Sequence, residues 1–213
     1  MKIDFINSKS PIEYNEALER MENYVRDIID NNANEVVWLL EHKDIYTAGV
    51  STDFTDILNK DINIIKTGRG GKITFHGKGM RILYLMLDLK KRNACDIKKY
   101  IANIQYLIIN SLKYLGVNAY CLDDHIGVWV KNPNIPNGHD KIAAIGVRVR
   151  KWVSFHGVAI NISPDLSKFE QIIACGINEK NLGITSLKEL NIDISKEEFD
   201  KILISEFNKI FNA

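Results

Sequence analysis

The sequence predicts one domain of the α+β (α/β) class. Apolar runs such as EVVWLLEH (35–42) and RILYLMLDL (81–89) are typical of strands that are buried in a sheet. Amphipathic stripes with helical spacing follow capping signals near both ends of the chain. The 213 residues, 46% hydrophobic and 26% charged, suffice for one large core, whereas two domains would be cramped.

Local signals place most of the elements in order. Ser10, Pro11 and Glu13 predict a capped helix that runs to about Asn31, and Ser195 with Glu198 predicts a capped C-terminal helix. Asp96 is expected to cap a third helix that ends near Gly116. Short strands are expected over 2–7, 63–67, 118–122 and 126–131, loops over 46–53 and 68–80, and a short helix over 166–172.

The stretch KIAAIGVRVRKWVSFHGVAINI (141–162) mixes strand-forming residues with small ones. The small side chains leave space beside the backbone at five positions: Ala143, Ala144, Gly146, Gly157 and Ala159. On two neighbouring strands they would open a slot for a thin ligand, and a barrel corner or tight sheet packing explains them equally well. A strand pair is predicted around the preceding turn, KNPNIPNGHD.

Composition excludes several classes of protein. The net charge of +1 is too small for a nonspecific nucleic-acid binder, although it permits a local basic patch. No apolar run reaches the roughly 18 residues of a membrane span. Cys95, Cys121 and Cys175 lack the spacing of a metal site and are expected to be thiols in a reducing, cytoplasmic compartment.

The glycine-rich segment GRGGKITFHGKGM (68–80) does not match a nucleotide-binding motif. A Walker A loop would need glycine at Lys66 and Ser or Thr at Ile73, and the dinucleotide pattern would need its third glycine at Ile73 or Ile82. The segment instead offers a flexible backbone with cationic side chains for a negatively charged ligand.

Cys175 is the candidate nucleophile, because little bulk covers a thiol between alanine and glycine. Lys141 would favour the thiolate if it lay against it, although a lysine there is normally a solvated strand end. His76 and His156 are candidate bases, or ordinary hydrogen-bonded histidines. Cys95 and Cys121 are expected to be structural, with Cys121 a small buried hydrophobe.

Four motifs together resemble one family. RGGKITFHGKG, HIGVWV, KIAAIGVRVRKWVSFHGVAINI and ACGI occur in the order in which lipoyl(octanoyl) transferases carry similar segments, and LEHKDIYTAG extends the resemblance from about Leu40 to about Thr185. The resemblance implies the fold of biotin and lipoate protein ligase catalytic domains: a mixed sheet with helices packed on one side. It also implies an enzyme without a metal, cofactor or ATP, with residues 1–213 as a single catalytic domain.

By the same resemblance, Cys175 becomes the acyl-thioester nucleophile and Lys141 the group that lowers its pKa. Three positions depart from the family pattern, namely Ala174, Lys78 and Met80. The substrate-binding positions are Arg69, Gly70, Gly71, Lys72, Ile73, Thr74, Phe75, His76, Ala144, Ile145, Gly146, Gly157, Val158 and Ala159.

The implied reaction moves an octanoyl or lipoyl group from an acyl-carrier-protein thioester to a lysine of a lipoyl domain. The acceptors would be lipoyl domains of 2-oxoacid dehydrogenase complexes or the glycine cleavage protein, with no role for nucleic acid or membrane. An ATP-dependent lipoate or biotin ligase and a non-catalytic acyl-carrier-binding module are the alternatives. A basic rim for the carrier is expected at Arg69, Lys72, Lys78, Arg148, Arg150 and Lys151.

Overall fold

An eight-stranded mixed sheet forms the centre of the computed structural model, which describes residues 2–174, 177 and 179–211. The strand order is β1-β2-β6-β10-β9-β8-β7, and β11 pairs with β9. The β1–β2 and β9–β11 pairs are parallel, and the others are antiparallel. The strands are β1 (Ile3–Asn7), β2 (Glu35–Leu40), β6 (Met80–Met86), β7 (Ala119–Tyr120), β8 (Val128–Asn132), β9 (Gly138–Arg150), β10 (Val153–Asn161) and β11 (Leu182–Ile184).

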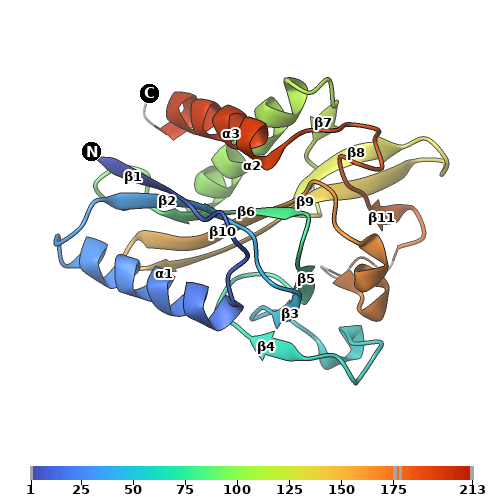
Figure 1. The fold of residues 1–213 in the computed structure, drawn as a ribbon, viewed down its shortest axis with the longest axis horizontal. Helices are drawn as coiled ribbons and strands as arrows, with labels where there is room; N and C mark the ends of the chain where they lie inside the picture. The colour runs from blue at the N-terminus through green and yellow to red at the C-terminus, as the bar shows by residue number, and fades with distance from the viewer. Residues whose placement is uncertain (1, 175–176, 178, 212–213) are drawn as a thin grey trace.

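A smaller three-stranded sheet lies beside it, in the order β4-β3-β5 (Figure 1). Its strands are β3 (Ile45–Ala48), β4 (Ile64–Lys66) and β5 (Thr74–His76). The helices are α1 (Tyr14–Ile29), α2 (Ile97–Lys113) and α3 (Lys196–Phe211), with short 3₁₀ turns η1 (Phe54–Asp56) and η2 (Leu166–Gln171). The single α+β domain with a mixed sheet is therefore confirmed.

Helices cover both faces of the main sheet. Figure 1 shows α1 on one side and α2 with α3 on the other. The expectation of helices on one side is wrong, and β2 shows the physical reason: all of its residues are buried, with Val37 and Leu39 facing the α2–α3 side and Trp38 facing the α1 side. A strand that is apolar on both faces needs cover on both.

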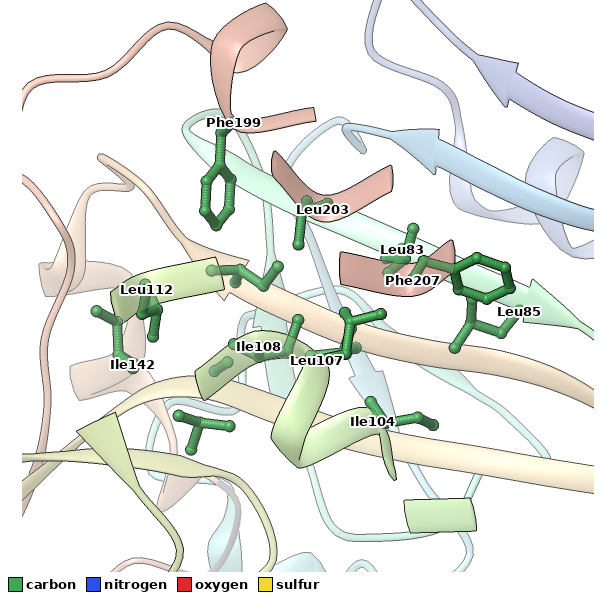
Figure 2. Packing of buried hydrophobic residues seen from close by; sticks show 14 of the residues in the cluster. Leu83, Leu85, Ile104, Leu107, Ile108, Leu112, Ile142, Phe199, Leu203 and Phe207 are labelled. Atoms are coloured by element: carbon green, nitrogen blue, oxygen red, sulfur yellow. The ribbon is translucent and has the colours of Figure 1, made fainter. Parts of the chain in front are cut away.

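The larger apolar core lies between the sheet and the pair α2–α3. Figure 2 shows Phe199, Leu203 and Phe207 of α3 packing towards the apolar side chains of α2 and of the sheet beneath. Leu107, Ile108 and Leu112 of α2 are fully buried, as the helical spacing of apolar residues in the sequence predicts. This core fixes α2 next to β9, and with it one wall of the site described below.

Several local predictions are confirmed and two are wrong. Asp96 accepts a hydrogen bond from the Lys99 amide, and the Ser195 hydroxyl accepts one from the Glu198 amide. The predicted capping box at Ser10 is absent, since α1 begins at Tyr14 after Glu13, which caps without a side-chain hydrogen bond. The loops expected over 46–53 and 68–80 contain most of β3 and all of β5. These two strands pair with each other although they lie far apart in the sequence, and local sequence patterns do not indicate such a pairing.

A buried ion pair ties α3 to the main sheet. Arg81 of β6 makes hydrogen bonds of 2.7 and 2.6 Å to the two carboxylate oxygens of Asp200, and Asn7 contacts both residues. Both side chains of the pair are nearly inaccessible to solvent. Each charge is therefore stabilised by its partner, and removal of either partner would leave a buried, unpaired charge. Among the described residues, no helix has both the length and the apolar character that crossing a membrane requires.

Candidate active site

A cavity of about 410 Å³ lies between β9, β10 and the segment 69–76, within the size range of small-molecule sites. It opens beside exposed side chains, Ile97 of α2 and Ile126, and is closed at its other end by buried ones. We call it the central pocket. It is lined by Tyr14, Arg69, Gly70, Gly71, Lys72, Thr74, His76, Ile82, Tyr84, Ile97, Ile101, Asp124, His125, Ile126, Lys141, Ala144, Ile145, Gly146, Val147, His156, Gly157, Val158 and Ala159.

The small residues of β9 and β10 lie side by side along one wall of this pocket. Gly146 pairs with Gly157, and Ala144 pairs with Ala159. A Cβ at Gly157 would lie 2.1 Å from the Leu83 carbonyl oxygen, and one at Gly146 would lie 2.8 Å from that of Gly70. The glycines therefore admit neighbouring backbone as well as line the pocket, so the two explanations drawn from the sequence both apply.

Arg69 organises the glycine-rich loop from inside. Its guanidinium donates to the Thr47 carbonyl at 2.7 Å, to the Thr47 hydroxyl at 2.8 Å and to the Lys72 carbonyl at 2.8 Å. Only 7% of Arg69 is exposed, so its place in the predicted basic rim is wrong. A rigid, multi-donor fork of this kind holds several carbonyls at once, which fixes the loop over β9, where the Gly70 amide donates to Val147.

Lys141 lies at the open end of the pocket. It is 5% exposed, and its ammonium group is 4.7 Å from the ring centroid of Trp129 on the neighbouring strand β8. The expectation of a solvated strand end therefore does not hold for this lysine. Burial of a cation beside an aromatic face holds it in a fixed position.

Cys175 lies outside the described residues, but its neighbours in the chain can be placed. Ala174 is buried, and the Ile173 amide donates to the Asp56 carbonyl at 2.7 Å. On the other side, Glu179 approaches His125 of the pocket mouth at 3.2 Å, and β11 brings Ile184 into register with Lys141. The segment that follows Cys175 thus leads towards the open end of the pocket.

Two of the expected substrate-binding residues do not line the pocket. Ile73 and Phe75 are buried in the core on the α1 side, where Phe75 packs against Tyr46 and Phe169. Strand alternation is the reason, because Thr74 and His76 face the pocket and their neighbours face away. The other described members, Arg69 to Lys72, Thr74, His76, Ala144 to Gly146 and Gly157 to Ala159, do line it.

The closed end of the pocket is polar. Tyr14, His76, Tyr84 and His156 line it together, and each is at most 6% exposed. Burial lowers the pKa of His156 to about 3 and that of His76 well below its ordinary value, so both are neutral at pH 7. These histidines are thus poor bases, and the catalytic role that the sequence suggested for them has no support here.

His42 supports this end from behind. Its Nε2 lies 2.7 Å from the Tyr84 hydroxyl and its Nδ1 lies 3.1 Å from the Ile12 carbonyl, while burial lowers its pKa to about 4. Sequence reasoning missed Tyr14, Tyr84 and His42. The available signal was a tyrosine inside the apolar run of β6 and a histidine closing that of β2, since buried polar groups need partners.

Cys95 and Cys121 are exposed, so the prediction of a buried Cys121 is wrong. Cys121 directly follows β7, and this strand of two residues ends before it can bury the residues beyond it. Of the departures from the family pattern, Met80 and Ala174 are buried and Lys78 is exposed. Within the described residues, no group of three or more His, Cys, Asp or Glu side chains is placed to hold a metal ion.

Comparison with known proteins places the chain in a family. Residues 13–208 match the family model described as the lipoyl protein ligase A/B catalytic domain. An octanoyltransferase of a Wolbachia species from Brugia malayi is 48% identical over 209 residues, covering 98% of this chain and 100% of that relative. An octanoyltransferase of Rickettsia bellii is 50% identical over 212 residues, covering 98% and 99%.

Solved structures agree at the level of the fold. A bi-partite lipoate protein ligase from Thermoplasma acidophilum, described with its E2 lipoyl domain, superposes with a TM-score of 0.70 at 16% identity, covering 99% of this chain and 83% of that one. A biotin protein ligase from Aquifex aeolicus gives a TM-score of 0.56 at 10% identity, covering 98% and 68%. With close relatives of this name along nearly its whole length, the chain belongs to the octanoyltransferases, within the family of lipoyl protein ligase A/B catalytic domains.

Proposed function

We propose that residues 1–213 act as a single octanoyltransferase catalytic domain in protein lipoylation, working in the cytoplasm. The observation that carries the proposal is a buried Lys141 at the open end of a pocket whose wall is made of small and apolar residues. Such a pocket suits a saturated acyl chain, and we infer that the thioester carbonyl lies beside this lysine when the chain is bound. Free, exposed Cys95 and Cys121 fit a reducing compartment.

The chemistry is thiol exchange followed by aminolysis. The Cys175 thiolate attacks the carbonyl of an acyl-carrier thioester, and the carrier leaves as a thiolate that takes up a proton. The ε-amine of an acceptor lysine then attacks the acyl-cysteine, an amide bond forms, the amine loses a proton, and the Cys175 thiolate is released. Lys141 stabilises that thiolate by its positive charge, so the acyl group stays activated throughout and ATP has no step to drive.

The donor is an acidic acyl-carrier protein, and the acceptors are lipoyl domains of 2-oxoacid dehydrogenase complexes or the glycine cleavage protein. Of the predicted basic rim, Lys78 and Lys151 are exposed and make no ion pair within the described part of the chain. Arg148 and Arg150 share Glu22 at 4.0 and 3.2 Å, and Lys72 pairs with Asp56, which reduces the charge these three present. Docking should therefore depend mainly on the two unpaired lysines.

The test is mass spectrometry after mixing the protein with octanoyl-carrier in the absence of nucleotide. A covalent octanoyl adduct on Cys175, chased to a lysine when a lipoyl domain is added, is the expected result. Cys175→Ser is the matched control, because it keeps the size of the side chain and should give no thioester adduct. Transfer to the lipoyl domain by Cys175→Ser at the parent rate would overturn the acyl-cysteine route.

An ATP-dependent lipoate or biotin ligase is the second candidate, because ligases such as a lipoate-protein ligase A solved with ATP share the fold at a TM-score of 0.69 and 17% identity. Transfer that starts only when ATP and a free fatty acid are supplied would favour it. A non-catalytic carrier-binding module would bind the carrier and give neither an adduct nor transfer.

A further inference from the structure

The open end of the central pocket carries one histidine, His125. It belongs to the pocket lining, and 28% of its side chain is exposed, so a ligand at the mouth can reach it. The other four histidines of the sequence do not occupy this place. His42, His76 and His156 are buried at or behind the closed end, and His139 of β9 is not part of the lining.

A carboxylate and an aromatic ring hold His125 in place. Its Nε2 lies 3.2 Å from Oε1 of Glu179, and its ring makes a T-shaped contact with that of Trp129 at a centroid distance of 5.8 Å. The Trp129 indole N–H donates to the His125 carbonyl at 3.0 Å. Because a carboxylate only accepts, the contact with Glu179 places the proton of a neutral imidazole on Nε2. Nδ1 makes no hydrogen bond to any described residue, so its lone pair is available.

An imidazole whose second nitrogen is oriented by a carboxylate is a common form of general base. Lys141 lies against the same Trp129 ring, but it cannot take this role. A lysine that stabilises a thiolate must keep its proton, and an ammonium group has no lone pair to accept another. Asp124 also belongs to the pocket lining, but a carboxylate is a much weaker base than an imidazole. Of the described residues at the open end, His125 is therefore the one suited to accept a proton.

We propose that His125 is the catalytic base of aminolysis, the second half of the reaction, and removes a proton from the ammonium group of the acceptor lysine. The inference rests on the proposed acyl-cysteine route and adds the residue that makes the acceptor nucleophilic. Nδ1 takes one proton, the freed nitrogen lone pair forms the C–N bond, and the electron pair of the C–S bond leaves on the Cys175 sulfur. Glu179 stabilises the imidazolium by its charge. The second surplus proton of the nitrogen and the proton on the imidazolium then pass to water, which restores His125.

The two halves of the reaction make different demands on this base. Thiol exchange uses a thiolate that Lys141 already stabilises, so it needs no proton acceptor. Aminolysis by lysine starts from an ammonium ion, whose lone pair a base must first expose. Hydroxylamine is a weakly basic amine that is largely neutral at neutral pH, so its lone pair is free when it reaches the acyl-cysteine. Loss of the base should therefore slow transfer to lysine selectively, whereas displacement of the loop that carries His125 would slow all three processes.

His125→Gln is the variant to test, because glutamine keeps a donor for Glu179 but cannot take a proton from an ammonium group. The octanoyl adduct is formed from octanoyl-carrier and freed of carrier, and its decay with a lipoyl domain or with hydroxylamine is followed by mass spectrometry. Adduct formation and the hydroxylamine reaction should stay within about threefold of the parent rates, and transfer to the lipoyl domain should be at least about 100-fold slower. His139→Gln makes the same substitution outside the pocket lining and should match the parent in every step.

A smaller loss of lipoyl-domain transfer in His125→Gln would overturn the inference and leave the acyl-cysteine route intact. Similar losses in all three processes would also overturn it, since His125 would then only hold the loop in place. The loss should lie in the limiting rate at saturating lipoyl domain, and a loss confined to the concentration that gives half the limiting rate would assign His125 to docking instead. If the parent protein forms no adduct, the proposed function fails, and this inference fails with it.

Discussion

The ammonium group of Lys141 lies 4.7 Å from the ring centroid of Trp129, and the indole N–H of Trp129 donates to the His125 carbonyl at 3.0 Å. One aromatic ring thus connects the buried lysine to the loop at the pocket mouth. His125 in turn approaches Glu179, four residues beyond Cys175. A cation held on a π face is fixed in position, and a fixed cation is what activation of a nearby thiol requires.

Thiol activation is the first consequence to test. For unit charges about 4 Å apart at an effective dielectric near 20, attraction is roughly 4 kcal/mol before desolvation is subtracted. Iodoacetamide should therefore label Cys175 with a midpoint well below ~8.5 in the parent and near or above that value in Lys141→Met. Cys121 is an internal reference, because partial desolvation and Asp123 raise the pKa of its exposed thiol. Identical Cys175 curves in the folded variant would show that Lys141 does not activate it.

Chain-length preference should respond to volume in the slot. Ala159 lines the pocket and pairs with Ala144, so Ala159→Leu fills space that the acyl chain would occupy. Each buried methylene contributes about 0.8 kcal/mol, or roughly fourfold, so preference should shift to donors shorter than octanoyl. Competition between hexanoyl and octanoyl carriers measures the shift. A variant that is folded and keeps the parent profile would mean that the chain lies elsewhere.

Carrier docking should depend on salt and on the unpaired lysines. Lys78→Glu should slow association with the carrier and flatten its dependence on salt between about 0.05 and 0.5 M, because screening acts on exposed charges. Lys201→Glu on α3, which lines no part of the pocket, makes the same change of charge and serves as the control. Equal effects of both variants in stopped-flow measurements would assign the change to net charge alone.

Removal of one partner of the Arg81–Asp200 pair should be costly. Asp200→Ala leaves a buried, unpaired guanidinium and should lower the free energy of unfolding by about 3–5 kcal/mol. Arg81→Met combined with Asp200→Leu should recover much of that loss, since two apolar groups need no pairing. Urea denaturation of the three proteins gives the comparison, and a double variant no more stable than Asp200→Ala would contradict the desolvation argument. The exposed Lys43–Glu13 pair should matter much less.

The buried histidines should make the protein sensitive to mild acid. The pKa values of His42, about 4, and His156, about 3, lie below the value of ~6.5 expected in the unfolded chain. Below pH ~6.5 the unfolded chain takes up protons that the folded chain does not, so the stabilisation is complete above that pH and is lost as pH falls. Each histidine contributes up to about 1.4 kcal/mol per pH unit.

His156→Asn should reduce the number of protons taken up on unfolding by up to one. The slope of the free energy of unfolding against pH, measured between about pH 5 and 6.5, reports that number. Parent and variant curves should run parallel above pH 7, where these imidazoles are neutral in both states. An unchanged slope in mild acid would show that His156 is protonated in the folded protein.

Elements whose signals are local could be predicted from the amino-acid sequence alone. Periodic apolar residues and capping side chains located α2 and α3, and the continuous apolar runs located β2 and β6. Family motifs predicted the residues of the site, because several short segments agreed in order along the chain. Small residues on β9 and β10 indicated a slot, and their register places them on one pocket wall.

Contacts between distant parts of the folded chain set which side chains face that slot and which charges are exposed. A strand sends neighbours to opposite faces, so Thr74 and His76 line the pocket while Phe75 does not. In the sequence Arg69 has the character of an exposed cation, but in the structure its guanidinium donates to the Thr47 and Lys72 carbonyls. The closed end of the pocket draws on α1, β5, β6 and β10, and the positive φ that turns His156 towards it has no local signature, because it depends on contacts between residues far apart in the chain.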